Sequence, residues 1–102
     1  MLESKVEAYL RREVEGRGGV CRKWVAPGHT GVPDRIVVLR GMVWFVELKQ
    51  DDGRLSPIQR AEQKKLTDAG ASVVTLYGLQ GVRTFLNTID PKGGEADEVR
   101  AT

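Results

Sequence analysis

Two short apolar runs joined by Arg40-Gly41 constrain the fold of this chain most strongly. The runs are residues 36–39 (IVVL) and 42–46 (MVWFV), and β-rich runs joined by two residues that include glycine are typical of a β-hairpin. If the loop consists of Arg40 and Gly41 alone, the numbers of facing residues add up to 81. The same register places Asp34 directly opposite Glu47, and such paired Cβ atoms lie about 4.5–5.5 Å apart.

The facing carboxylates of Asp34 and Glu47 indicate a cation site. Like charges at that distance are unfavourable unless something positive separates them. A divalent cation such as Mg²⁺ does so, because it takes carboxylate, carbonyl and water oxygens as ligands. Lys49 lies two residues beyond Glu47 and so projects from the same face, where it could hold a water or steady a phosphoryl oxygen. The alternative is a surface hairpin with scattered charges at its end.

The composition indicates one small soluble domain. The 102 residues suffice for one modest core, and no apolar run approaches the ~18 residues of a membrane span. The N-terminus lacks the apolar core of a signal peptide. Cys21 is the single cysteine, which excludes an internal disulfide and fits a reducing cytosol, and one histidine gives no support for structural zinc. Residues 90–102 carry four acidic and two basic groups, which leaves the rest of the chain at +4 and compatible with a polyanion.

Hydrophobic periodicity predicts an α/β protein with the order α-β-β-β-α-β-α. The expected helices are residues 2–15, 57–69 and 80–89, and the expected strands besides the hairpin are residues 20–26 and 72–77. The strand–helix–strand unit that ends at Tyr77 predicts a right-handed parallel crossover. Because the hairpin is apolar on both faces, we expect a sheet covered on both sides. Residues 1–89 should form the domain and residues 90–102 a disordered tail.

The second helix begins with a strong start signal. Ser56 is an expected N-cap, Pro57 takes the first helical position, and Gln59 at the third completes a capping box. From the residues alone, reaching back to the Ser56 amide is the favoured role of Gln59. The expected inward-facing residues of this helix are Ile58, Ala61, Leu66 and Ala69.

Several short motifs, taken together, resemble a known nuclease family. Pro33-Asp34 and Glu47-Leu48-Lys49 match the PD-(D/E)xK nuclease superfamily, and the whole set resembles the virus-type replication-repair nuclease (VRR-NUC) family. The residues that carry this resemblance are Glu3, 31–35, 45–49 and 56–59, so it spans most of the chain. It implies a restriction-endonuclease-like core, with a mixed central sheet flanked by helices.

The resemblance also implies a divalent-metal-dependent endonuclease that hydrolyses DNA with Mg²⁺, for which Mn²⁺ could substitute. Asp34, Glu47 and the backbone carbonyl of Leu48 would be metal ligands, and Lys49 would orient or activate the attacking water. Glu3 would complete the site from the first helix, with Glu7 as the alternative acid. Gln59 would support Lys49 or the site, which competes with its capping role.

Family members of this size are similar to Holliday-junction resolvases, which implies a homodimer that acts on branched DNA in the cytosol of a bacterial or phage-infected cell. Alternatives are a non-specific nicking or duplex nuclease, and a non-catalytic DNA-binding module with the same fold. His29, in the glycine-rich loop of residues 27–31, either contacts phosphate or merely belongs to the loop. Phosphate contacts carry affinity without sequence information. The cations available for them are Arg11, Arg12, Arg17, Arg22, Lys23, Arg35, Lys64 and Lys65.

Overall fold

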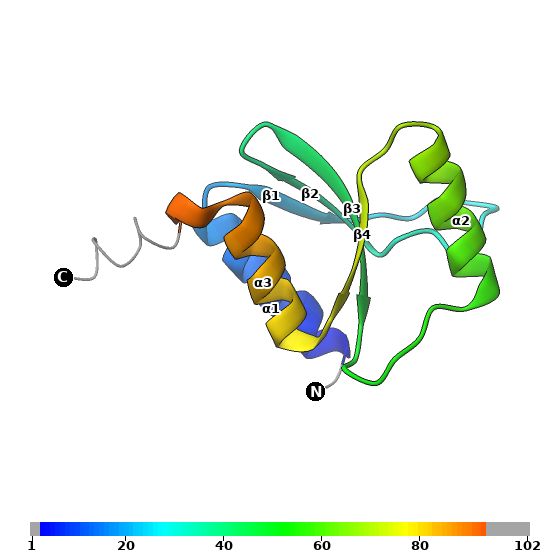
Figure 1. Ribbon diagram of the computed structural model, residues 1–102, viewed down its shortest axis with the longest axis horizontal. Helices are drawn as coiled ribbons and strands as arrows, with labels where there is room; N and C mark the ends of the chain where they lie inside the picture. Colours follow the sequence, from blue (N-terminus) through cyan, green and yellow to red (C-terminus); the bar gives the residue numbers. More distant parts are fainter. Residues whose placement is uncertain (1–2, 94–102) are drawn as a thin grey trace.

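The computed structural model describes residues 3–93, and its elements follow the predicted order (Figure 1). Helix α1 (Glu3–Gly16) precedes the strands β1 (Val20–Lys23), β2 (Arg35–Leu39) and β3 (Met42–Lys49). Helix α2 (Pro57–Asp68) leads to β4 (Val73–Tyr77), and α3 (Gly78–Ile89) follows. The predicted order α-β-β-β-α-β-α is confirmed, although β1 ends three residues earlier than the expected strand of residues 20–26.

The four strands form one mixed sheet in the order β1-β2-β3-β4. β1 and β3 each pair with β2 in antiparallel fashion, and β3 pairs with β4 in parallel fashion. Leu39 faces Met42 and Arg35 faces Val46, so the predicted hairpin register is confirmed. The loop residues Arg40 and Gly41 have φ angles of 53° and 78°, and positive values at both positions are those of a type I′ turn.

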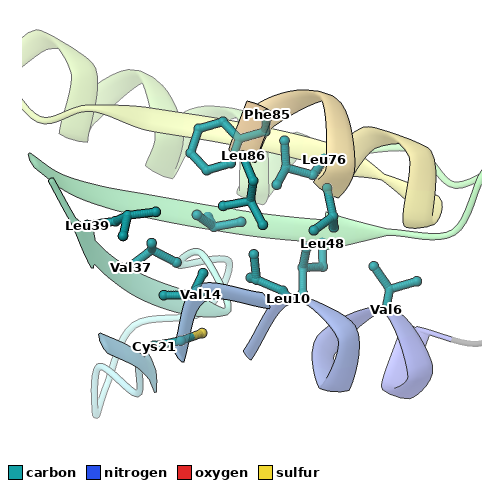
Figure 2. Packing of buried hydrophobic residues seen from close by; sticks show 12 residues of the cluster. Val6, Leu10, Val14, Cys21, Val37, Leu39, Leu48, Leu76, Phe85 and Leu86 are labelled. Atoms are coloured by element: carbon teal, nitrogen blue, oxygen red, sulfur yellow. The ribbon is translucent and has the colours of Figure 1, made fainter. Parts of the chain in front are cut away.

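The hydrophobic core lies between one face of the sheet and the helices α1 and α3, which run side by side (Figure 1). Figure 2 shows side chains of both helices converging on alternate residues of the strands. Because side chains alternate along a strand, burial of Val46 and Leu48 directs Glu47 and Lys49 to the opposite face. The buried apolar residues are Val6, Leu10, Val14, Cys21, Val37, Leu39, Val46, Leu48, Leu76, Val82, Phe85 and Leu86.

Helix α2 lies on the opposite face of the sheet and contributes no buried residue (Figure 1). The expected inward face was wrong in part: Ile58 is 56% exposed, and Ala61 and Ala69 are also exposed. The half-buried side chains are instead Gln59, Glu62, Gln63 and Leu66. Two glutamines explain this rotation, because Gln59 donates to Glu47 at 3.2 Å and Gln63 donates to Thr75 at 2.9 Å. Polar contacts to the sheet, rather than apolar periodicity, orient this helix.

The same face of the sheet is uncovered near the hairpin turn. Val38 and Val43 face each other across β2 and β3, and their side chains are 38% and 50% exposed. The prediction of a sheet covered on both sides therefore fails at this end. The cause is the length of α2, whose 12 residues extend about 18 Å and whose contacts are with the other end of β3 and with β4.

The folded domain extends beyond residue 89. Asp90, expected as the first residue of the tail, is only 2% exposed and forms ion pairs with Arg17 and Arg40. Residues 91–93 continue as a short helical turn, and the amide of Gly93 donates to the carbonyl of Asp90 at 3.2 Å. The remainder of the expected tail, residues 94–102, lies outside the described residues.

Candidate active site

Asp34 is fixed by both neighbouring strands. Its backbone carbonyl accepts a hydrogen bond from the Trp24 amide at 2.9 Å, which extends the β1–β2 register by one pair. Its carboxylate oxygen Oδ2 accepts from the backbone amide of Leu48, also at 2.9 Å. Leu48 lies between Glu47 and Lys49 in the chain, so this hydrogen bond holds Asp34 at the middle of the Glu-x-Lys motif. This contact agrees with the predicted hairpin register, which places Asp34 opposite Glu47.

Glu47 is the most deeply buried acid of this group, with 2% of its surface exposed. Its Oε2 lies 3.2 Å from the donating Nε2 of Gln59 and 3.7 Å from Nζ of Lys49. Lys49 is itself largely buried, with 15% of its side chain exposed. A buried carboxylate is costly unless it is paired and hydrogen-bonded. Gln59 and Lys49 together supply those partners for Glu47.

Gln59 contacts both the helix cap and an acid of the candidate site. The side-chain Oε1 of Gln59 accepts a hydrogen bond from the backbone amide of Ser56 at 2.9 Å. The backbone amide of Gln59 donates to Ser56 Oγ at 3.2 Å, which completes the capping box. The other end of the same side-chain amide donates to Glu47. The cap fixes the rotamer of Gln59 at the start of α2, and that rotamer aims its NH₂ group at the site.

The first helix approaches the site beside Arg35, the residue after Asp34. Arg35 Nε lies 3.8 Å from Glu7 Oε1, so Glu7 is engaged by a cation. Glu3 is the first residue of α1, and its side chain lies outside the described part of the structure. Among the described side chains, no group of three or more His, Cys, Asp or Glu residues is arranged to hold a metal ion. The described acids at the site are thus Asp34 and Glu47.

The loop that precedes Asp34 packs against the start of α2. A Cβ atom at Gly31 would lie 2.5 Å from Ile58 Cγ2 and 3.1 Å from the Gln59 amide nitrogen, and the φ angle of Gly31 is 81°. Only glycine allows this approach without displacing α2. His29, in the same loop, is exposed and its amide donates to Ala26 at 3.0 Å. Gly31 therefore sets the distance between the Asp34 segment and Gln59.

The eight candidate cations differ in how available they are to DNA. Arg17 is unavailable to DNA, because its side chain is 7% exposed and binds Asp90. Arg35 is occupied by Glu7. Arg11, Lys64 and Lys65 are exposed but form local ion pairs along their own helices. Arg12, Arg22 and Lys23 are exposed and form no ion pair within the described residues.

Sequence reasoning gave no role in the site to Trp24, Thr75 and Gln63. Trp24 continues β1 opposite Asp34, and its ring lies against Phe45 with centroids 4.9 Å apart. Thr75 pairs with Glu47 in the β3–β4 register and accepts a hydrogen bond from Gln63. Gln59 and Gln63 are one helical turn apart, and this spacing could have indicated which face of α2 contacts the sheet. No local feature of the sequence around Gly31 predicts its contact with Ile58.

No protein-family model matches this chain. The curated "Putative nuclease p44" of Acyrthosiphon pisum secondary endosymbiont phage 1 is 40% identical over 75 residues, which cover 72% of this chain and 81% of that protein. A solved structure described as "VRR_NUC domain" has a TM-score of 0.77 and 31% identity, covering 83% of this chain and 94% of that one. Hjc of Archaeoglobus fulgidus, a Holliday junction resolvase, has a TM-score of 0.55 at 16% identity over 72% of this chain and 66% of its own, which shows a shared fold.

Fold and site together define a nuclease-type protein with a restriction-endonuclease-like core. Asp34, directly before β2, is held to the Glu47-x-Lys49 motif of β3 through the Leu48 amide, as this class of protein leads one to expect. At the level of sequence and structure, the chain belongs to the virus-type replication-repair nuclease family. Within residues 3–93, no helix is long and apolar enough to cross a lipid bilayer.

Proposed function

We propose that this protein is a divalent-metal-dependent endonuclease that hydrolyses phosphodiester bonds in DNA. The observation that carries the proposal is the Asp34 carboxylate bound to the Leu48 amide, between Glu47 and Lys49. This contact brings the acid before β2 close to the acid of β3, beside the basic side chain of Lys49. A structural hairpin has no need for that arrangement, whereas phosphodiester hydrolysis uses acids that hold a metal and a cation that faces the phosphate.

The donor set fits a hard cation. Asp34 and Glu47 offer carboxylate oxygens, and the Leu48 amide points toward Asp34. In an extended strand the C=O and N–H of one residue point to the same side, so the Leu48 carbonyl would face this edge as the third ligand. Mg²⁺ is commonly bound through one or two carboxylates together with waters and substrate phosphates, and Mn²⁺ accepts the same oxygen ligands. The bound metal would polarise the phosphoryl group and lower the pKa of an attacking water.

The remaining residues position the reacting groups. Lys49, 3.7 Å from Glu47, would donate a hydrogen bond to the attacking water or to a phosphoryl oxygen. Gln59 would keep Glu47 in one rotamer, because its own rotamer is fixed by the Ser56 cap. We assign the helix acid to Glu3 rather than Glu7, since Arg35 already engages Glu7.

The substrate class that we propose is branched DNA, cut by a homodimer in the cytosol of a bacterial or phage-infected cell. The support is the fold shared with an archaeal Holliday junction resolvase, together with the relative from a phage. A two-fold dimer presents two equivalent sites, one for each of two strands in a junction. The substrate is tested separately from the chemistry, because one fold hosts several functions.

The decisive experiment compares cleavage of labelled four-way junction, flap and linear duplex DNA by the unaltered protein and by Lys49→Ala, each with Mg²⁺, Mn²⁺ or EDTA. Symmetric cuts in the junction that require metal and are lost in Lys49→Ala are the expected result. Equal cutting of all three substrates would replace the branched-DNA assignment with a non-specific nuclease. Binding without cleavage of any substrate would refute the enzyme and leave a DNA-binding module.

A further inference from the structure

A groove between the first turns of α1 and the start of α3 lies outside the candidate active site. It has a volume of about 280 Å³ and is lined by Lys5, Ala8, Tyr9, Arg12 and Leu79. Tyr9 and Leu79 pack against the hydrophobic core and form an apolar wall. Lys5, Tyr9 and Arg12 follow one another at spacings of four and three residues, so they lie along one face of α1. The groove thus combines a fixed apolar wall with exposed cations.

Tyr9 draws two guanidinium groups together at this groove. The guanidinium carbon of Arg12 lies 5.6 Å from the centroid of the Tyr9 ring, a cation–π distance. Arg83, on α3, donates from Nε to the Tyr9 hydroxyl at 3.4 Å and from Nη1 to Gln80 at 3.5 Å. The aromatic side chain therefore holds the two arginines from different helices on one surface.

These cations carry charge that the described residues do not neutralise. None of Lys5, Arg12 and Arg83 forms an ion pair within residues 3–93, and no acid is among the residues that line the groove. Neighbouring arginines differ, because Arg11 and Arg35 each face a glutamate. Like charges held together are unfavourable until an anion binds between them. The groove has the charge pattern of an anion-binding surface.

Both walls of the groove begin at the catalytic end of the sheet. α1 is tied there through Glu7 and Arg35, which follows Asp34, and α3 starts directly after Tyr77, which pairs with Lys49. Figure 1 shows the first turns of α1 and α3 side by side at that end. From Lys5 to Arg12 the helix rises about 10 Å, which matches about three phosphate spacings of one DNA strand at about 3.4 Å along the duplex axis.

We propose that this groove binds the phosphate backbone of a DNA segment next to the cleaved bond. The proposal rests on the proposed function, since DNA is the polyanion that the active site would process. Lys5, Arg12 and Arg83 contact successive phosphates, and Tyr9 sets the position of both arginines. Such contacts fix the register of DNA on the protein and carry no sequence information.

The test measures DNA binding without cleavage. Fluorescence anisotropy with labelled four-way junction and linear duplex DNA, in EDTA and over a series of KCl concentrations, gives the slope of log affinity against log salt. The variant Lys5→Gln/Arg12→Gln/Arg83→Gln should reduce the magnitude of that slope by about 2.7, because each of the three phosphate contacts contributes about 0.9. The control Arg11→Gln/Lys64→Gln/Lys65→Gln removes the same charge from cations with local acidic partners and should change the slope by less than about 1.

An equal fall in the slope for variant and control would overturn the groove and leave net charge as the only factor. An unchanged slope in the triple variant, or no DNA binding by the unaltered protein, would also overturn the groove. Tyr9→Phe keeps the ring and the charge but removes the hydroxyl that receives Arg83, and should lower the slope by about one contact. Cleavage assays separate the two proposals. If the groove variant weakens DNA binding but the unaltered protein cleaves no DNA, only the nuclease proposal is refuted. If the unaltered protein cleaves DNA but the salt slope of the groove variant is unchanged, only the groove proposal is refuted.

Discussion

Gln59 joins the start of α2 to Glu47, with its Nε2 donating to Glu47 Oε2 at 3.2 Å and its Oε1 accepting from the Ser56 amide at 2.9 Å. One side-chain amide thus serves the helix cap and the buried acid together. Because α2 has no buried residue, this contact and the Gln63–Thr75 hydrogen bond are the main polar links from the helix to the sheet. The stability of α2 and the geometry of the site are coupled through Gln59.

The substitution Gln59→Glu should separate these two roles. Glutamate at the third helical position still completes a capping box, so the helix cap is kept, and the loss in free energy of unfolding, about 1–3 kcal/mol, comes from the buried Glu47 that loses its donor. The new carboxylate cannot donate to Glu47 and repels it, which should reduce the cleavage rate by about 10–100-fold. Urea unfolding and cleavage rates at saturating Mg²⁺ measure the two effects.

Ser56→Ala is the matched control, because it removes the hydroxyl of the cap and leaves Gln59 able to reach Glu47. It should destabilise the protein by about 1 kcal/mol and retain most of the activity. If Ser56→Ala instead lost as much activity as Gln59→Glu, the hydrogen bond to Glu47 would have no special role.

Gly31→Ala should damage the site from a distance. The added methyl group would meet Ile58 Cγ2 at 2.5 Å, and relief of that contact would move the first turn of α2. Overpacking of this kind costs about 1–3 kcal/mol, in addition to about 1–2 kcal/mol for a positive φ angle. We expect lower stability together with lower cleavage activity, measured by thermal unfolding and by rate.

Gly28→Ala provides the comparison within the same loop. Gly28 has the same φ angle of 81°, but a Cβ atom there would meet nothing within 4 Å. It should therefore show only the conformational cost, about 1–2 kcal/mol, with its activity retained. Equal activity of the two alanine variants would show that Gly31 does not position Gln59.

Asp34→Asn should abolish activity while preserving the fold. The side-chain carbonyl oxygen of the introduced asparagine can still accept from the Leu48 amide, so the strand contact survives although the charge is gone. Cleavage should fall on the order of 10³-fold or more, and adding Lys49→Gln should lower it little further, because residues that act as a unit are non-additive. Asp52→Asn, at an exposed position in the turn after β3, should leave the rate unchanged. A fully active Asp34→Asn protein would remove Asp34 from the proposed metal site.

The hairpin and its acids could be predicted from sequence because their determinants are local. A two-residue loop fixes the register, and the two-residue period of a strand fixes which side chains share a face. The pairing of Asp34 with the Glu47–Lys49 motif follows from those two rules alone. Gln59 was recognised twice, once from the cap and once from the family resemblance, and both interpretations describe real contacts.

Contacts between distant segments explain the failures. Apolar spacing predicted that Ile58 faces the sheet, but Ile58 is exposed. Hydrogen bonds from Gln59 and Gln63 to partners on β3 and β4 fix a different orientation of the helix. Asp90 looked like the start of a charged tail, because its partners Arg17 and Arg40 are 73 and 50 residues away in the chain. Local composition cannot show that such an acid is buried between two arginines.

Asp90 should make the stability of the protein depend on pH in the acid range. Burial raises the pKa of this carboxyl, but hydrogen bonds from Arg40 at 2.7 Å and Arg17 at 3.3 Å outweigh it and hold the pKa below the ordinary 3.8. A pKa that is lowered by folding contributes stability above the pKa of the unfolded state, and the contribution disappears as pH falls through the folded value. Asp90→Asn should therefore cost about 3–5 kcal/mol at pH 7, as removal of one partner from a buried ion pair does. Urea unfolding of both proteins at pH 7 and pH 3 should show the difference in unfolding free energy shrinking at the lower pH.

Asp68→Asn, which breaks an exposed pair with Lys64 on α2, should cost less than about 0.5 kcal/mol at either pH. A difference between the unaltered protein and Asp90→Asn that stays constant with pH would mean that the charge of Asp90 does not stabilise the fold.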